Sequence, residues 1–191
     1  MAGYNSLINN QNNIKGFILL DFKTLWESFP EKSLMKARCQ NKQETSSAPF
    51  DNYCAILLSE ALINVGVSTS SAKAAKCWSH SGTKHILRAE EMAKWLTSSN
   101  IGGLHKVEKI SPSTFQKDLK NRTGIIFFKD YWQRGNETTN NQSGDHIDLW
   151  NKDEISSSGM LMRSIYEFFG TVSDFNKAKK SIFGKLSDNY E

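Results

Sequence analysis

A single cysteine in the first turn of a predicted helix is the residue of this sequence best placed for covalent chemistry. Residues Phe50–Leu62 read FDNYCAILLSEAL, and their apolar spacing predicts a buried helix that begins next to Cys54. Asn52 is of a type favoured at helix N-caps. The unpaired N–H groups and the positive end of the helix dipole favour a thiolate there, and the thiolate is the reactive form of cysteine. We therefore predict that Cys54 is a nucleophile and that Asn52, beside it, contacts the substrate.

A cysteine nucleophile needs a base, and the segment Ser143–Asn151, SGDHIDLWN, offers one. In a strand, alternation places His146, Asp148 and Trp150 on one face, an expensive set to bury without a purpose. We predict that His146 takes the thiol proton, that Trp150 contacts the substrate, and that the N–H of Cys54 receives the oxyanion. Asp148 can orient His146 only through a favourable rotamer or a water, because residues two apart lie about 6.6 Å apart along a strand.

Taken one at a time, the cysteine and the histidine also have a structural interpretation. Most buried cysteines are small apolar residues, and a lone strand histidine is more often structural than catalytic. Their combination, a cysteine at a helix start followed by a histidine on a later strand, is the order of parts in papain-like and cell-wall cysteine peptidases. The other three histidines lie in or near polar segments, and we expect them at the surface: His80, His85 and His105.

The elements that must position these residues are predicted as helices first and strands later. Besides the Cys54 helix, the spacing predicts helices over Phe17–Phe29 and Ile86–Leu96, a short one after Ser111, and helix rather than strand over Met160–Phe169. Strands are predicted over Gly124–Phe128, His146–Trp150 and Ser181–Leu186, the first two forming a hairpin, while Ala37–Pro49 is predicted as a surface loop. This order is typical of the α+β class, with the cysteine helix packed on one face of an antiparallel β-sheet.

Length and composition favour one domain over residues 1–191, with the Asn- and Gln-rich residues 1–15 expected to be flexible. No apolar run approaches the roughly 20 residues that cross a bilayer, and Gly16–Leu20 is too short for a signal peptide. We therefore expect any export to use a route other than the general secretory one. The net charge of +4 is mild and scattered, which disfavours a nucleic-acid partner.

The three cysteines, Cys39, Cys54 and Cys77, make an odd count at irregular spacing, which argues against a disulfide framework. There is no Cys-x-x-Cys pair, and the cysteines and histidines show no familiar ligand spacing, so we expect no metal site. The thiol chemistry needs no organic cofactor. A disulfide between Cys39 and Cys77 is left open by the sequence.

Two segments resemble a known family of effectors. Asp51–Leu62 resembles the segment N-x-C-A-I-R-x-S-x-A-L of the type VI secretion amidase effectors, group four, and Gly144–Asn151 resembles their segment G-D/x-H-I/V-D/T-L-W-N. Lys84–Leu96 and Gly124–Lys129 are similar to further segments of the family and occur in the same order. The resemblance spans most of the chain, from about residue 22 to residue 186.

The resemblance implies a papain-like, NlpC/P60-like core and an antibacterial peptidoglycan amidase with Cys54 as nucleophile and His146 as general base. Such enzymes cut the γ-D-glutamyl–meso-diaminopimelate bond of the stem peptide without a metal or an organic cofactor. The type VI secretion apparatus delivers them to the periplasm of a rival cell without membrane insertion, which fits a chain with no signal peptide. The producing cell is then expected to make a cognate immunity protein.

The sequence departs from the family pattern at three places. Leu57 stands where the family usually has Arg, and Gly184 stands where an aromatic residue is expected. The third catalytic residue of the family is an Asp on the strand after the histidine, and by counting its place falls near Ser157. Asp148 is the substitute that we predict, with Asp153 as the alternative.

Two other functions compete with this interpretation. A housekeeping NlpC/P60 cell-wall hydrolase or a transglutaminase-like acyltransferase uses the same thiol chemistry, but such proteins normally carry a secretion signal or wall-binding repeats. A non-catalytic interaction domain is the other alternative, with Cys54 as a core residue and His146 structural. Thiol reactivity separates the classes, because an ion-paired thiolate reacts readily with iodoacetamide at pH 6–7 and a core cysteine does not.

Overall fold

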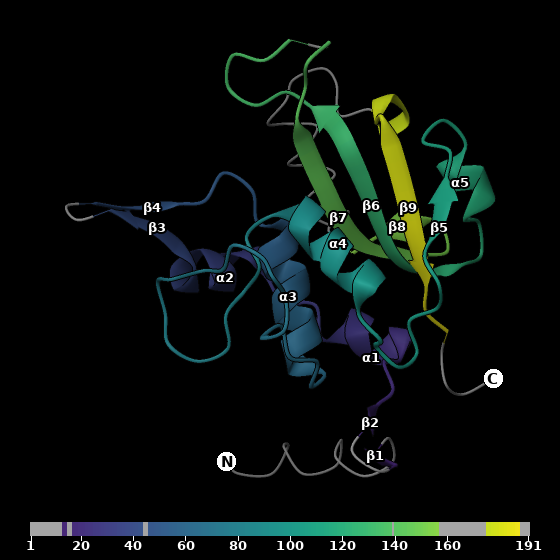
Figure 1. Cartoon of the computed structure of the whole chain (residues 1–191), viewed down its shortest axis with the longest axis horizontal. Helices are drawn as coiled ribbons and strands as arrows, with labels where there is room; N and C mark the ends of the chain where they lie inside the picture. Colours follow the sequence, from purple (N-terminus) through teal and green to yellow (C-terminus); the bar gives the residue numbers. More distant parts are fainter. Residues whose placement is uncertain (1–12, 15–16, 44–45, 139, 157–174, 188–191) are drawn as a thin grey trace.

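The computed structural model describes residues 13–14, 17–43, 46–138, 140–156 and 175–187. Its centre is an antiparallel sheet with the strand order β5-β9-β6-β7-β8, and helices α3 and α4 lie over one face of it (Figure 1). The strands are β5 (Glu108–Ile110), β6 (Thr123–Trp132), β7 (Gly144–Asn151), β8 (Glu154–Ile155) and β9 (Lys180–Lys185). The predicted α+β class, with the cysteine helix on an antiparallel sheet, is confirmed.

Most of the helical residues precede the sheet in the chain. The helices are α1 (Phe22–Glu27), α2 (Lys32–Arg38), α3 (Cys54–Asn64), α4 (Ala89–Ser98), α5 (Phe115–Asp118) and the 3-10 turn η2 (Phe175–Lys177). Two small hairpins pair β1 (Asn13–Ile14) with β2 (Phe17–Ile18), and β3 (Gln40–Gln43) with β4 (Ser46–Pro49). Among the described residues, no helix has the length and apolar character needed to span a membrane.

Two N-terminal segments differ from the prediction. The helix predicted over Phe17–Phe29 is shortened to α1, which begins after Asp21 because that carboxylate accepts the N–H of Thr24 at 2.8 Å and so caps the first turn. The loop predicted over Ala37–Pro49 contains the β3–β4 hairpin instead. Its polar sequence has no apolar alternation, so the pairing of backbone groups could not be read from the side chains.

Helix α3 is buried on two sides, which fixes the position of its first residue. Leu58 and Leu62 pack in the same cluster as Ile147 and Leu149 of strand β7. Leu57 belongs to a different cluster, formed with α2 and the residues just before α3. The helix ends at Asn64, and Gly66, with a φ of 89°, follows its C-cap. Contacts on both sides therefore hold the N-terminus of α3 in one place relative to β7.

The predicted hairpin between the two central strands is confirmed. Strands β6 and β7 pair antiparallel, with Phe128 opposite His146 and an irregularity in the register between Phe128 and Trp132. Asp130, within this irregularity, has a φ of 53°. Because β6 continues to Trp132, the connection between the strands is shorter than predicted.

The other face of the sheet carries an aromatic cluster. Phe115 of α5 lies 4.9 Å from Phe128 and 5.6 Å from Trp150, measured between ring centroids, and Phe175 of η2 stacks on Phe128 at 4.3 Å. The alternation of β7 places His146 on this aromatic side, while its neighbour Ile147 packs under the helices. The sheet thus separates an aliphatic layer, which supports α3, from an aromatic layer, which surrounds the imidazole.

Gly124→Ala is expected to destabilise the fold by about 3 kcal/mol, because the added methyl group has no room. A Cβ at Gly124 would lie 2.3 Å from the carbonyl oxygen of Gly184 and 2.7 Å from Cζ of Phe183 on the neighbouring strand. A fall in the urea midpoint measures the loss. Gly135→Ala is the control, since a Cβ there meets nothing within 4 Å and adds only the cost of its φ of 53°, about 1 kcal/mol. Equal losses in the two variants would show that β6 and β9 adjust to the methyl group.

Two expectations fall outside the described residues. The helix favoured over Met160–Phe169 lies entirely within residues 157–174, and the predicted flexible residues 1–15 fall almost entirely within residues 1–12 and 15–16. The remaining predicted helices and strands are present with shifted ends: Ile86–Leu96 is α4, Gly124–Phe128 is the first half of β6, and Ser181–Leu186 is β9.

Candidate active site

Cys54 is the first residue of α3, as predicted, and its side chain is 6% exposed. Tyr53 occupies the N-cap position, but it is Asn52 that supplies the side-chain bond, with its Oδ1 accepting the N–H of Cys54 at 2.9 Å. The hydroxyl of the buried Tyr53 donates to the carbonyl of Cys39 at 2.7 Å. Bonds on both sides of the peptide segment therefore fix the backbone from which the thiol projects.

His146 and Asp148 form a buried pair on β7, each 1% exposed. Nε2 of His146 lies 3.2 Å from Oδ2 of Asp148, so the carboxylate reaches the imidazole directly and needs no bridging water. The other carboxylate oxygen of Asp148 accepts the N–H of Leu149 at 2.8 Å and the hydroxyl of Ser156. Because these two donors occupy Oδ1, Oδ2 faces the imidazole. An acceptor at this position favours the tautomer of His146 that carries its proton on Nε2.

The second ring nitrogen of His146 is then available to the cysteine. No described residue gives its buried Nδ1 a hydrogen bond of normal geometry. Burial by itself lowers the pKa of His146, but the hydrogen bonds to Asp148 and Cys54 outweigh burial and raise this pKa to about 10. Cys54, His146 and Asp148 are thus brought together in the order thiol, imidazole, carboxylate.

Aromatic rings that the sequence did not single out surround the imidazole. Tyr131 lies 6.1 Å and Phe175 5.6 Å from the ring of His146, measured between centroids. Burial, and then the negative charges of Cys54 and Asp148, raise the pKa of the Tyr131 hydroxyl, so this phenol stays protonated beside the site. The strand containing Tyr131 was predicted to end before it, and Phe175 lies in a segment without a periodic signal, so neither residue could be placed here from the sequence.

The predicted oxyanion donor is already engaged. The N–H of Cys54 was expected to point at the substrate, but in this structure it donates to Asn52. A side-chain cap on the first turn competes with a substrate for the same donor. Asn52 is half-buried and adjoins the thiol through this bond, so its place next to the predicted nucleophile agrees with the sequence.

Trp150 lies in the core, and its predicted substrate contact stays a prediction. Its side chain is 3% exposed, its Nε1 donates to the carbonyl of Leu119 at 2.8 Å, and it packs edge-on against Phe115. The alternation of β7 placed Trp150 correctly on the face of His146. What the sequence did not reveal is that α5 covers this end of the strand.

The departures from the family pattern have local explanations. Leu57 is 2% exposed in the apolar cluster beside α2, where an unpaired Arg side chain would be costly. A Cβ at Gly184 would lie 2.9 Å from Cδ1 of Leu104, so a larger residue at this position requires the Leu104 side chain to move. The alternative acid, Asp153, is exposed in the turn between β7 and β8, while Ser157 lies outside the described residues. Among these candidates, Asp148 is the acid that contacts His146.

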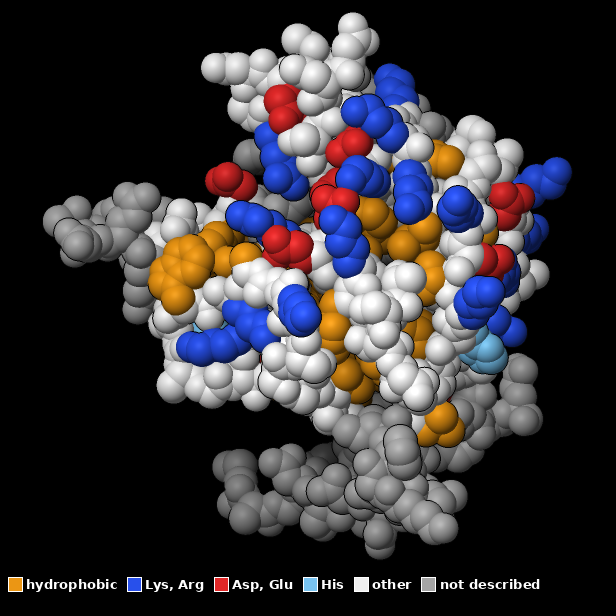
Figure 2. Space-filling model, in the orientation of Figure 1, with side chains coloured by type: hydrophobic (Ala, Val, Ile, Leu, Met, Phe, Trp, Pro, Cys, Tyr) orange, Lys and Arg blue, Asp and Glu red, His pale blue; other side chains and the backbone are white. Residues whose placement is uncertain are grey.

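The prediction that the other histidines lie at the surface is wrong for His85. Its side chain is 0% exposed, His80 is half-buried and only His105 is exposed. The backbone of Cys77 pairs with that of His85 at 2.8 Å and draws the segment onto the side of α3, where Glu60 offsets the cost of burial. On the face seen in Figure 2, Lys and Arg side chains are interspersed with Asp and Glu, in agreement with the mild net charge.

Comparison with known proteins gives a family and a fold. The model of the family described as type VI secretion system (T6SS), amidase effector protein 4, Tae4, matches residues 50–183. The type VI effector Tae4 from Enterobacter cloacae is a similar solved structure, 18% identical, with a TM-score of 0.57 over 88% of this chain and 96% of that chain. The Tae4/Tai4 effector–immunity system from Salmonella typhimurium is another, 17% identical, with a TM-score of 0.57 over 87% and 97%. No curated protein sequence matches.

The similarity to these solved structures concerns the fold. The solved structures confirm the predicted α+β, papain-like and NlpC/P60-like fold. The family match covers both the helix that begins at Cys54 and the strand that carries His146.

Proposed function

The chain belongs to the type VI secretion amidase effector protein 4 family and is therefore an antibacterial peptidoglycan amidase, and we propose that it is a cysteine endopeptidase. Its proposed substrate bond joins γ-D-glutamate to meso-diaminopimelate in the stem peptide. The observation that supports the cysteine mechanism is the His146–Asp148 pair. Nε2 of His146 lies 3.2 Å from Oδ2 of Asp148, which leaves Nδ1 for the thiol of Cys54.

In the proposed reaction, Nδ1 of His146 takes the proton of the Cys54 thiol, and the thiolate attacks the carbonyl carbon of the γ-glutamyl amide. The imidazolium then gives its proton to the departing amine of diaminopimelate as the C–N bond breaks. A water, deprotonated by the now neutral imidazole, attacks the thioester and releases the carboxylate and the free thiol. Asp148 acts through His146 as a positioning residue, because it fixes the tautomer and favours the imidazolium.

Oxyanion stabilisation requires a change at the start of α3. We propose that substrate binding exchanges the bond between the Cys54 N–H and Asn52 for one to the carbonyl oxygen of the substrate. The side chain of Asn52 then becomes free to contact the substrate, which is the role expected for it from the sequence. Its amide can both donate and accept, so it suits a peptide group.

The family also suggests how the protein reaches its target and how the producing cell inhibits it. We propose that the type VI apparatus carries the protein to the periplasm of a target cell, where peptidoglycan is accessible. The Tae4 proteins of Salmonella typhimurium and Enterobacter cloacae are described in complexes with the immunity protein Tai4. By analogy, this chain is expected to have a cognate immunity protein that denies substrates access to Cys54.

The bond assignment is tested by incubating the full chain with Gram-negative sacculi and identifying the soluble muropeptides by mass spectrometry. We expect fragments that end in D-glutamate, paired with fragments that begin with a free diaminopimelate amine. Cleavage at another stem-peptide bond contradicts the substrate assignment but keeps the amidase. Intact sacculi from folded protein contradict the amidase itself and favour the non-catalytic alternative.

A housekeeping cell-wall hydrolase is the alternative with the same chemistry. Expression of the protein in the periplasm of a susceptible cell, with and without a candidate immunity protein, separates the two. Lysis that the immunity protein prevents supports an effector with an immunity partner. Growth without lysis supports the housekeeping function.

A further inference from the structure

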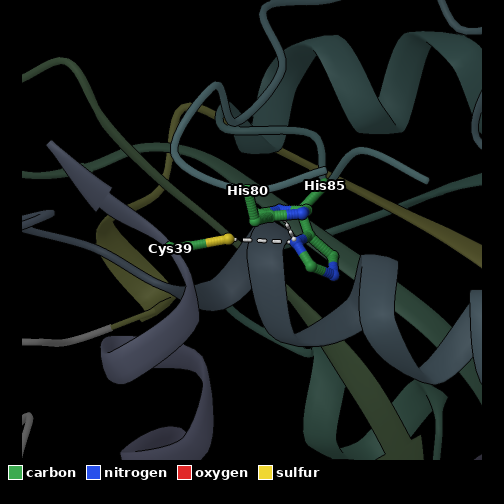
Figure 3. Close-up of side chains that lie close together, drawn as sticks. All are labelled: Cys39, His80 and His85. Carbon is green, nitrogen blue, oxygen red and sulfur yellow. Dashed lines mark hydrogen bonds between the residues drawn. The ribbon is translucent and has the colours of Figure 1, made fainter. Parts of the chain in front are cut away.

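A second cluster of reactive side chains lies on the side of α3, outside the catalytic arrangement. The thiol of Cys39 is 2.9 Å from Nδ1 of His85, and Nε2 of His80 is 3.0 Å from the same nitrogen. The three potential ligand atoms all lie within 4.8 Å of one another, and Figure 3 shows the thiol and both imidazole rings converging on one point. The three residues come from two segments of chain, the end of α2 and the connection between α3 and α4.

Each of the two imidazole rings has an inner nitrogen, which faces the other ring, and an outer nitrogen, which faces a different partner. The partners of the outer nitrogens determine whether the inner nitrogens are protonated. Nε2 of His85 lies 2.6 Å from a carboxylate oxygen of Glu60, and Nδ1 of His80 lies 2.8 Å from the carbonyl oxygen of Ser81. Both partners are acceptors at the pH of a cell, so both outer nitrogens must carry the proton. In neutral rings the two inner nitrogens are therefore lone pairs, and they face each other at 3.0 Å. Such a contact is repulsive unless a cation or an extra proton lies between the atoms.

The thiols beside the two histidines favour a metal ion, rather than an extra proton, between the two inner nitrogens. Cys39 is completely buried, and the buried Cys77 thiol adjoins it. Neither thiol is exposed to solvent, and thiolates are soft ligands that bind zinc. A divalent cation supplies the positive charge that a thiolate and two inward lone pairs require.

We propose that Cys39 Sγ, His80 Nε2 and His85 Nδ1 bind a Zn²⁺ ion, with the adjoining thiol of Cys77 as the fourth ligand. Sulfur and imidazole donors select zinc over calcium or magnesium. Binding replaces the thiol protons, so each coordinated cysteine releases one H⁺ to solvent. Glu60 supports His85 in the way that carboxylates support zinc-bound histidines elsewhere.

The position of the site indicates a structural role. Cys39 caps the C-terminus of α2, Glu60 lies in α3, and the two histidines belong to the connection that follows α3. The carbonyl of Cys39 accepts the hydroxyl of Tyr53, the residue directly before the nucleophile. The ion thus joins the end of α2 to the connection after α3, next to the residue that precedes Cys54. It increases the stability of that region and takes no part in the reaction.

The test is Co²⁺ binding to the full chain, reduced and carrying Cys54→Ala so that the catalytic thiol cannot bind metal. We expect the visible bands of tetrahedral Co²⁺, near-ultraviolet charge transfer from thiolate, and loss of both on adding Zn²⁺. Loss of an outer partner typically costs about 10- to 100-fold in metal affinity. We therefore expect Glu60→Gln to weaken binding in that range and His80→Ala, which removes a ligand, to weaken it further. His105→Ala, at an exposed histidine, is the matched control and should bind normally.

Stability gives a second measurement that does not depend on spectra. Because a metal that binds only the folded state raises the melting temperature, Zn²⁺ should raise Tm of the His105→Ala protein and not that of His80→Ala. Cys77→Ser should reduce the charge-transfer intensity by about half if Cys77 is a ligand. Absence of cobalt bands, equal binding in His80→Ala and His105→Ala, or a Cys39–Cys77 disulfide that persists under these reducing conditions would each overturn the proposal. Undiminished charge transfer in Cys77→Ser would overturn the assignment of the fourth ligand.

Discussion

Replacing Cys54 by alanine is expected to reduce the rate of peptidoglycan cleavage by roughly four to six orders of magnitude, the cost of losing a nucleophile that acts together with its base. The variant should remain folded, because Cys54 is the first residue of α3 and its helix is held by apolar contacts on two sides. Muropeptide release from sacculi measures activity, and circular dichroism measures folding. A folded Cys54→Ala protein with wild-type activity would show that the nucleophile is another residue.

The same residue can be tested without mutation by its reactivity. Iodoacetamide at pH 6–7 should alkylate Cys54 selectively and abolish activity, because reactive cysteines are typically found at a helix N-terminus beside a histidine. Cys39 and Cys77 are 0% and 1% exposed and serve as internal controls in the same chain. Peptide mapping of the labelled protein identifies the modified cysteine. Slow and equal labelling of all three cysteines in the native protein would favour the structural interpretation of Cys54.

Asp148→Ala is expected to lower kcat/KM by about three orders of magnitude and to move the alkaline limb of the pH profile to lower pH. The imidazolium of His146 must protonate the leaving amine, so activity falls as pH rises through the pKa of His146, about 10 in the wild type. The carboxylate of Asp148 is one of the groups that raise this pKa. Without it, burial lowers the pKa, and the loss of activity begins at lower pH. Profiles of kcat/KM measured with a soluble stem peptide from pH 5 to pH 11 test this.

Two control variants make the assignment of the positioning residue specific. Asp153→Ala removes the other acid considered for this role, and because its side chain is exposed in the β7–β8 turn, the pH profile should not move. Asp148→Asn keeps an oxygen that can accept from Nε2 of His146, so it should recover part of kcat but retain the shifted limb. A shifted profile in Asp153→Ala, with an unchanged one in Asp148→Ala, would exchange the two roles.

The periodicity of apolar residues in the sequence was enough to predict the elements that carry Cys54 and His146. The apolar spacing after Cys54 predicts α3, and the alternation of His146–Trp150 predicts β7 and the face that carries His146 and Asp148. Both patterns are intrinsic to short segments of chain, because a helix or strand must repeat its buried side with the period of its backbone. For the same reason, the hairpin of β6 and β7 was predictable. The ends of its strands were not, because the periodicity does not specify where backbone pairing stops.

Other features depend on partners that are distant in the chain. The core position of Trp150 could not be read from β7, because the residues that cover it, Phe115 and Leu119, belong to a distant segment around α5. His85 looked like a surface residue because its segment is polar, but Glu60 and Cys39 offset the cost of burying it. Neither partner is recognisable from the polar segment itself.

The sequence by itself determined the residue types at the site, the helix that presents Cys54 and the strand that presents His146, since these follow from periodicity within a dozen residues. Only the tertiary structure decided that Asp148 contacts Nε2 of His146, that Asn52 engages the N–H of Cys54, and that a second cluster forms around His85. The physical reason is that rotamers and burial are set by whichever side chains pack around a residue. A linear pattern specifies which face of an element is buried, but not which atoms meet across it.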